Sequence, residues 1–176
     1  MKKFILSYLI ISLVTFSSCA QDIPETLPAI EKKAFSKKLE RLLSFTAPVI
    51  GVQELSESTD KYLILDSREE EEYQVSHIPG AKFSGYKNFD WTVLDGVSKD
   101  QPIVLYCSVG YRSEKMAEDL MEQGYTNVQN LYGSLFEWAN ADLPMQDGEG
   151  NPTKKIHTYN SKWSRWVEDG ELIKVW

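Results

Sequence analysis

The sequence predicts a single α/β domain with a largely parallel sheet flanked by helices, and three observations support this. Four short apolar runs read as strands, at residues 49–52, 62–65, 103–106 and 128–131. Helical stretches lie between them, and this alternation is typical of a parallel sheet covered by helices. The roughly one hundred residues of this region are enough for one hydrophobic core that folds independently.

Residues 1–18, which precede this domain, are expected to be an export signal peptide. Two lysines at the start supply the positive region, and residues 4–16 supply the apolar region. The apolar run is too short and too interrupted to form a comfortable membrane span. The signal therefore predicts export and does not predict a transmembrane helix.

The small residues Ser17 and Ser18 directly before Cys19 resemble the bacterial lipobox, with Phe16 where leucine is usual. We expect Cys19 to be lipidated and to anchor the chain to a membrane of the bacterial cell envelope, facing the periplasm or the exterior. The alternative is an ordinary secretory signal cut near Ala20. With Cys19 lipidated, the second cysteine of the chain would be its only free thiol, and no intramolecular disulfide could form.

Residues 19–47 are expected to form a tether and an N-terminal helix. Residues 21–28 are polar and contain prolines, as flexible tethers do. Apolar residues then recur at a spacing of three to four, which predicts a helix that packs on the domain rather than on a membrane. These residues are Ile30, Phe35, Leu39, Leu42 and Leu43.

Residues 48–145 hold the predicted domain, and charged residues follow its second strand. Asp66 and Arg68 come directly after this strand, where a buried pair that braces the neighbouring loops is expected. The acidic run from Glu69 to Glu72 is interpreted as a solvated helix start, because negative charge suits a helix N-terminus. The aromatic segment at residues 82–94 either lines the active pocket or covers an edge of the sheet.

Cys107 is the candidate nucleophile of the chain. It follows the apolar run 103–106 and precedes a predicted helix that begins near Ser113 and ends at Gly124. Gly110 permits a tight loop, and Arg112 places a permanent cation at the start of the helix. Both the helix N-terminus and Arg112 should lower the pKa of the thiol from about 8.5, as a nucleophilic cysteine requires.

The run from Cys107 to Ser113 has the form C-x-x-G-x-R-S and resembles the active loop of the rhodaneses, a family of sulfurtransferases. Residues 66–81 are similar to the family's signature D-x-R, E-(F/Y), G-H-I-P-G-A, in which Glu72 and Tyr73 supply the middle element, and residues 124–144 follow its closing pattern. The resemblance covers about residues 48–145. Ser76 and Ser134 depart from it, because the family usually has glycine at both positions, and this puts the geometry of two turns in doubt.

The length of the loop favours sulfur transfer over phosphate chemistry. Six residues run from Cys107 to Arg112 inclusive, as in the sulfurtransferases, whereas the related phosphatases and arsenate reductases have a loop one residue longer. The resemblance implies that Cys107 takes a sulfane sulfur from a small anionic donor, such as thiosulfate or a persulfide. It then passes this sulfur to a thiol or cyanide-like acceptor. No metal or organic cofactor is implied.

The resemblance also assigns roles to the remaining motif residues. The loop residues Ser108, Val109, Gly110 and Tyr111 would hold the terminal sulfur through their backbone amides. Arg112 would orient this cradle and attract the donor, and Ser113 would donate to the thiolate or start the helix. His77, in the H-I-P-G-A signature, is expected to be a scaffold residue that packs a turn.

Residues 146–176 form a C-terminal extension outside the family pattern. Large apolar residues at mostly helical spacing run up to Gly170, and they are expected to be buried against the domain or, alternatively, to dock a protein partner. These residues are Ile156, Tyr159, Trp163, Trp166 and Val167.

The overall charge limits the function further. The net charge of −7, with no basic stripe, argues against a nucleic-acid partner. Lack of a second nearby cysteine weakens a thiol-reductase function. The leading hypothesis is thus a membrane-tethered sulfurtransferase, and the alternative is a non-catalytic rhodanese-like module that carries a persulfide or binds a partner.

Overall fold

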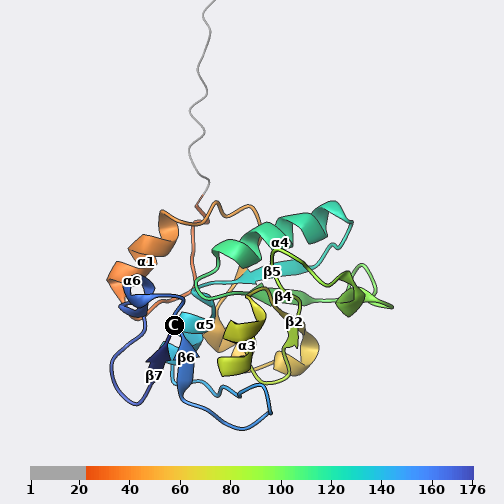
Figure 1. Ribbon diagram of the computed structural model, residues 1–176. Helices are drawn as coiled ribbons and strands as arrows, with labels where there is room; N and C mark the ends of the chain where they lie inside the picture. The colour runs from red at the N-terminus through yellow and green to blue at the C-terminus, as the bar shows by residue number, and fades with distance from the viewer. Residues whose placement is uncertain (1–22) are drawn as a thin grey trace, which may run out of the picture.

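The computed structural model describes residues 23–176, and the predicted signal peptide and Cys19 lie outside this described part. Its centre is a five-stranded sheet in the order β1-β5-β4-β2-β3, in which every pairing is parallel (Figure 1). The prediction of an α/β domain with a parallel sheet and flanking helices is confirmed. The strands are β1 (Val49–Ile50), β2 (Leu63–Asp66), β3 (Lys82–Phe83), β4 (Ile103–Tyr106) and β5 (Val128–Leu131).

The helices connect these strands and extend the domain at both ends. They are α1 (Lys33–Glu40), α2 (Val52–Ser56), η1 (Thr59–Lys61), α3 (Glu70–Val75), η2 (Trp91–Leu94), α4 (Tyr111–Glu122), α5 (Ser134–Asn140) and α6 (Ser161–Ser164). Within residues 23–176, no helix has the length and apolar character needed to cross a membrane.

The central strand β4 is apolar throughout because both of its faces are buried. Successive side chains of a strand point to opposite faces of the sheet. Val104 and Tyr106 belong to the core on one face, and Ile103 and Leu105 belong to the core on the other, which α4 covers. All four residues are fully buried. Helices on both faces therefore require an uninterrupted apolar run.

The parallel arrangement brings the carboxyl ends of the strands to one edge of the sheet. β4 lies between β2 and β5, and Cys107 comes directly after its last residue. Open α/β sheets bind their ligands at this edge. The fold thus places the candidate nucleophile at the usual position of a site.

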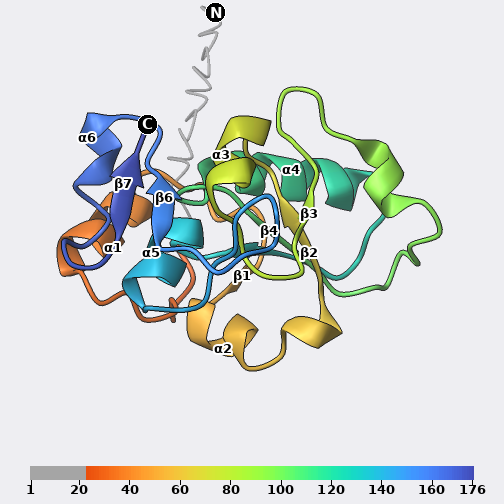
Figure 2. The same cartoon turned by 60° about the horizontal axis from the view of Figure 1, so that its bottom comes forward.

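The N-terminal helix and the C-terminal extension both join the core on the face opposite α4. Phe35, Leu39 and Leu43 are fully buried there, together with Ile156 and Val167 of the extension. Figures 1 and 2 both show α1 beside α6. Within the described residues, α1 and the C-terminal extension are therefore packed against each other on the domain.

The extension does not form the helix that its spacing suggested. It contains a parallel pair of short strands, β6 (Lys155–His157) and β7 (Ile173–Val175), with the single turn of α6 between them. Tyr159 has a positive φ of 64°, and the side chain of Asn160 then caps α6. A residue in the left-handed conformation cannot continue a helix, so no helix runs from residue 154 to Gly170.

Asp66 and Arg68 form the buried pair that the sequence predicted. Both side chains are fully buried, and the guanidinium donates to Asp66 at 2.6–3.1 Å. The same guanidinium donates to the Ser76 carbonyl oxygen at 2.6 Å. The pair therefore ties the end of β2 to the turn after α3. Ser76 has an extended backbone, with φ −168°, which any residue adopts, so its replacement of glycine causes no backbone strain. Its buried hydroxyl has no hydrogen-bond partner among the described residues.

His77 has structural contacts. Its ring stacks on Tyr73, with 3.8 Å between the ring centroids, and Nδ1 lies 3.0 Å from the Tyr73 carbonyl oxygen. The backbone of His77 bonds to Gln146 in both directions. Burial lowers the pKa of His77, which favours the neutral ring. These contacts join α3 to the start of the C-terminal extension.

We predict that Asp66→Ala and Arg68→Met each lower the free energy of unfolding by about 3–5 kcal/mol, because each leaves a buried charge unpaired. The double variant should lose much less than the sum, since neither charge remains. Urea unfolding of the four proteins measures this. The exposed Asp60→Ala serves as control, with a change within about 0.5 kcal/mol. Additive losses would show that the two charges are not coupled.

Candidate active site

The loop after β4 turns the chain from the strand into α4. Gly110 has a φ of 108°, and α4 begins at the next residue. A Cβ at Gly110 would meet its neighbours at ordinary contact distance, 3.5 Å or more, so the conformation and not the space requires glycine here. The helix begins at Tyr111, two residues earlier than predicted, and Arg112 thus lies in its first turn.

The turn directs backbone N–H groups at the sulfur of Cys107. The N–H of Gly110 donates to Sγ at 3.1 Å. Burial raises the pKa of the thiol, but the charge of Arg112 and the N–H groups of Ser113, Val109 and Gly110 outweigh it and lower the pKa. A lowered pKa increases the fraction of thiolate, which is the nucleophilic form of cysteine.

Arg112 is held by an acid that the sequence analysis interpreted as solvated. Its guanidinium binds both carboxylate oxygens of Glu72, at 2.6 and 2.8 Å, and donates to the hydroxyl of Ser108 at 3.0 Å. The Ser108 hydroxyl in turn donates to Glu72 at 2.9 Å. Only 2% of Glu72 is exposed. The solvated interpretation of the acidic run is therefore wrong for its last member.

The ion pair changes the properties of both partners. Burial raises the pKa of Glu72, but hydrogen bonds from Arg112 and the charges of Arg112 and Arg68 outweigh this and lower it to about 2. Glu72 is therefore ionised at neutral pH. Its charge offsets that of Arg112, so the guanidinium positions the loop but contributes less attraction for an anionic donor than a free cation would.

A buried asparagine, which the sequence analysis did not single out, supports the loop from β5. The side chain of Asn130 accepts from the Ser113 hydroxyl at 2.7 Å and donates to the Gly110 carbonyl oxygen at 3.0 Å. The Ser113 hydroxyl thus faces Asn130 rather than the thiolate as proposed, and Ser113 acts on the sulfur through its backbone N–H.

The first turn of α5 holds the other side of the loop. The N–H groups of Leu135 and Phe136 donate to the carbonyl oxygens of Cys107 and Ser108, both at 3.1 Å. The Ser134 hydroxyl accepts from the N–H of Cys107 at 3.2 Å. Ser134 replaces a family glycine and still adopts a positive φ of 51°. The backbone conformation of Ser134 is unfavourable for a residue other than glycine, but its hydroxyl makes a hydrogen bond to the loop that glycine could not make.

A pocket of about 340 Å³ opens above the loop, and Cys107, Ser108, Val109, Tyr111 and Arg112 form part of its lining. Of the other predicted motif residues, Asp66, Arg68 and His77 support the surrounding turns and do not line it. Its remaining walls come from Leu42, Glu69, Tyr86, Lys87, Tyr159 and Trp163.

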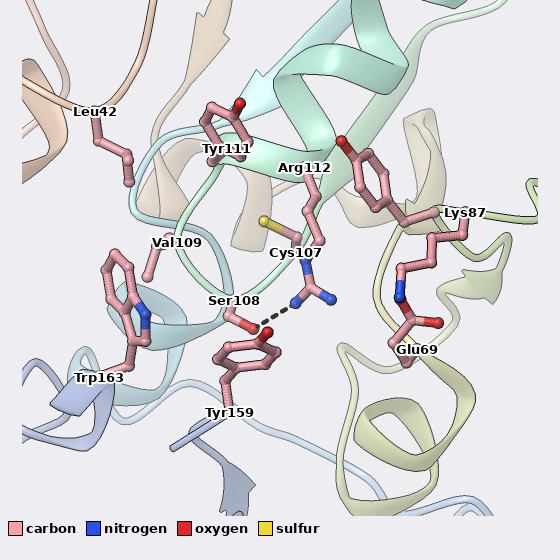
Figure 3. Close-up of a pocket in the computed structure, with 11 residues that line it drawn as sticks. Leu42, Glu69, Lys87, Cys107, Ser108, Val109, Tyr111, Arg112, Tyr159 and Trp163 are labelled. Atoms are coloured by element: carbon pink, nitrogen blue, oxygen red, sulfur yellow. Dashed lines mark hydrogen bonds between the residues drawn. The ribbon is translucent and has the colours of Figure 1, made fainter. Parts of the chain in front are cut away.

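Figure 3 shows how these walls are arranged. The Cys107 sulfur is directed into the pocket, with Trp163 and Tyr159 on one side and Glu69 and Lys87 on the other. The aromatic segment at residues 82–94 contributes to the pocket through Tyr86, whose ring also packs on the core covered by α4. The first alternative for this segment, that it lines the pocket, therefore holds for Tyr86 and Lys87. Within residues 23–176, no group of three or more metal-ligating side chains is placed to hold a metal ion.

We predict that Arg112→Ala raises the pKa of Cys107, because it removes the largest of the contributions that lower it. In a Cys19→Ala chain Cys107 is the only thiol, so the pH dependence of its alkylation reports this pKa. The midpoint should move to higher pH in Arg112→Ala. Lys61→Ala is the control, because it also removes one positive charge. Lys61 precedes β2, at the edge of the sheet opposite to Cys107, so this variant should leave the midpoint of alkylation unchanged. A wild-type midpoint above that of a free thiol would contradict the proposed activation.

Comparisons with known proteins agree with this geometry. The pattern of the family described as Rhodanese-like domain matches residues 51–141. The thiosulfate sulfurtransferase GlpE of Actinobacillus succinogenes is 33% identical over 92 residues, which cover 52% of this chain and 82% of that protein. A sulfurtransferase of Allochromatium vinosum is 40% identical over 57 residues, or 32% of this chain and 53% of that protein.

Solved structures share the fold. The solution structure of a rhodanese-like domain from Anabaena has a TM-score of 0.53 and 21% identity, and the match covers 57% of this chain and 79% of that one. A thiosulfate sulfurtransferase of Pseudomonas aeruginosa has a TM-score of 0.55 and 20% identity, over 76% of this chain and 26% of that one. Together with the match of the family pattern to half of the sequence, this shows that the chain belongs to the rhodanese-like domain family.

Proposed function

We propose that the protein is a sulfurtransferase, which moves a sulfane sulfur from thiosulfate or a persulfide to a thiophilic acceptor through a persulfide on Cys107. The observation that carries this proposal is the thiol itself. Cys107 has a lowered pKa, accepts a hydrogen bond from the N–H of Gly110 and lies at the bottom of a pocket. The relatives named sulfurtransferase support the same chemistry.

In the first step the Cys107 thiolate attacks the outer sulfur of the donor. A bond forms between Sγ and this sulfur, and the bond between the two donor sulfurs breaks. With thiosulfate, the electron pair of the broken bond leaves on sulfite. Charge is conserved and no external oxidant or reductant is needed, because the outer sulfur is transferred in its own oxidation state.

The persulfide formed in this step carries a negative charge on its terminal sulfur. The loop amides and the first turn of α4 are the nearest donors to this charge, and their fixed directions stabilise it without reorganisation. In the second step the acceptor attacks the terminal sulfur. The bond to Cys107 breaks, and the electron pair returns to Sγ as the thiolate.

We predict that incubation with thiosulfate adds one sulfur atom to the protein, and that the Cys107→Ser variant gains none, because a hydroxyl is not ionised at neutral pH. Intact mass measures the gain, and cyanide-dependent formation of thiocyanate measures turnover. Sulfur gain without turnover would favour the alternative of a non-catalytic, persulfide-carrying module. Turnover by a folded Cys107→Ser variant would falsify the assignment of the nucleophile.

We also propose that the protein is a lipoprotein of the bacterial cell envelope, anchored through Cys19. The support lies in the sequence, where a short apolar signal ends in small residues before this cysteine. A domain tethered in this way would face the periplasm or the exterior and act on donors outside the cytoplasm.

We predict that the wild-type protein partitions into the detergent phase when cell extracts are separated, and that Cys19→Ala abolishes this partitioning or blocks maturation. Ser18→Ala, which keeps a small residue before the cysteine, is the control and should partition like the wild type. A mature wild-type protein that is wholly soluble, with its N-terminus beyond Cys19, would support the secretory alternative.

A further inference from the structure

The pocket above Cys107 has a wall that lies outside the rhodanese-like match. Leu42 follows α1, and Tyr159 and Trp163 belong to the C-terminal extension, whereas the family pattern covers residues 51–141. In Figure 3 Leu42 and Trp163 lie to the left of the Cys107 sulfur, and Tyr159 lies below it. The segment after α1 and the C-terminal extension therefore add a surface to the site that the matched residues 51–141 do not supply.

Contacts between α1 and the segment around α6 fix the position of Trp163. The rings of Phe35 and Trp166 stack with 5.6 Å between their centroids. The Lys38 ammonium lies 5.5 Å from the centre of the Trp163 ring. Lys32 also donates to the Arg165 carbonyl oxygen at 3.3 Å. These contacts hold Trp163 in place before a ligand binds. Binding therefore costs less side-chain entropy than it would if Trp163 had to be ordered by the ligand.

Tyr159 occupies an unfavourable backbone conformation at the mouth of the pocket. Its φ of 64° lies in the left-handed region, and its ring centre is 5.9 Å from the guanidinium carbon of Arg112. More than half of the side chain, 58%, is exposed, so burial of the ring does not compensate for the strain. Strained residues of this kind cluster at functional sites.

The chemistry of the wall suits an apolar ligand. Leu42 and Val109 line the pocket together with the aromatic rings of Tyr86, Tyr111, Tyr159 and Trp163. The two cations of the lining are Lys87 and Arg112, but Glu69 lines the same pocket and Glu72 neutralises Arg112. A volume of about 340 Å³ lies in the range of sites for small organic molecules, and thiosulfate would leave much of it unfilled.

We propose that the acceptor is a low-molecular-mass thiol with an aromatic or bulky apolar body, which packs against Trp163 and Tyr159. This rests on the proposed sulfurtransferase function. The thiolate of the acceptor attacks the terminal sulfur of the Cys107 persulfide, a new S–S bond forms, and the bond to Sγ breaks. The products are the persulfide of the acceptor and the Cys107 thiolate.

The burial of Cys107 favours a small thiol over a protein acceptor. Only 1% of its surface is exposed, and the walls enclose it from several sides. A cysteine on a folded partner would have to extend past Tyr159 and Trp163 to reach it. A small thiol enters the pocket whole and buries its apolar body in the same movement.

The test loads the full-length protein with sulfur and compares two acceptors, 2-phenylethanethiol and 2-mercaptoethanol. Both carry the thiol on the same two-carbon chain, and they differ in the group at its other end, which is a phenyl ring in one and a hydroxyl in the other. We expect kcat/KM for 2-phenylethanethiol to be roughly tenfold higher than for 2-mercaptoethanol. The packing of an aromatic ring against aromatic walls strengthens binding by about this factor. Trp163→Ala should bring the ratio close to one, and Trp163→Phe should retain most of it.

Trp176→Ala is the matched control, because Trp176 belongs to the same extension, is 64% exposed and does not line the pocket. It should keep the wild-type ratio. Equal rates for the two thiols in a protein that forms the persulfide and transfers sulfur to cyanide would overturn this inference alone. A faster reaction with a polar peptide that carries one central cysteine would also overturn it, in favour of a protein acceptor. Failure to form the persulfide would instead overturn the proposed function.

Discussion

The active loop depends on one electrostatic constraint, which is that a thiolate must remain charged at a position that water hardly reaches. Burial alone would keep Cys107 protonated. Arg112 and the converging N–H groups of the loop reverse this effect and lower the pKa. Glu72 binds the guanidinium of Arg112 with both carboxylate oxygens and holds it in place, which offsets the cost of partly burying this charge. The ion pair between α3 and α4 thus supports the chemistry indirectly.

The parallel sheet supplies the rigidity that this constraint requires. β4 is buried on both faces, so the position of Cys107 at its end is fixed by packing on two sides. Neighbouring elements then hold the loop, through hydrogen bonds from Asn130 of β5 and from the first turn of α5. Hydrogen bonds from rigid elements keep the loop amides directed at one point, which is the requirement for stabilising a charged sulfur without reorganisation.

The helix α1 and the C-terminal extension add a surface outside residues 51–141, which match the family. In residues 23–176, α1 and the C-terminal extension bury residues in the same core and meet through the stack of Phe35 on Trp166. This contact places the Trp163 wall over a site that belongs to the central domain. The reactive loop and these added walls come from separate parts of the chain, so the walls can change without a change in the loop.

The sequence by itself determined the parallel α/β fold and the reactive loop, because both follow from local patterns. An apolar strand, a cysteine, a glycine and a helix start with Arg112 are contiguous, so their geometry depends little on the rest of the chain. The tertiary structure alone decided that Glu72, the last acid of its run, is buried and binds Arg112. It also decided that the side chain of Asn130 accepts a hydrogen bond from the Ser113 hydroxyl, and that the positive φ of Tyr159 interrupts the expected C-terminal helix. Burial and partners at such positions depend on elements far away in the sequence, and no local pattern records them.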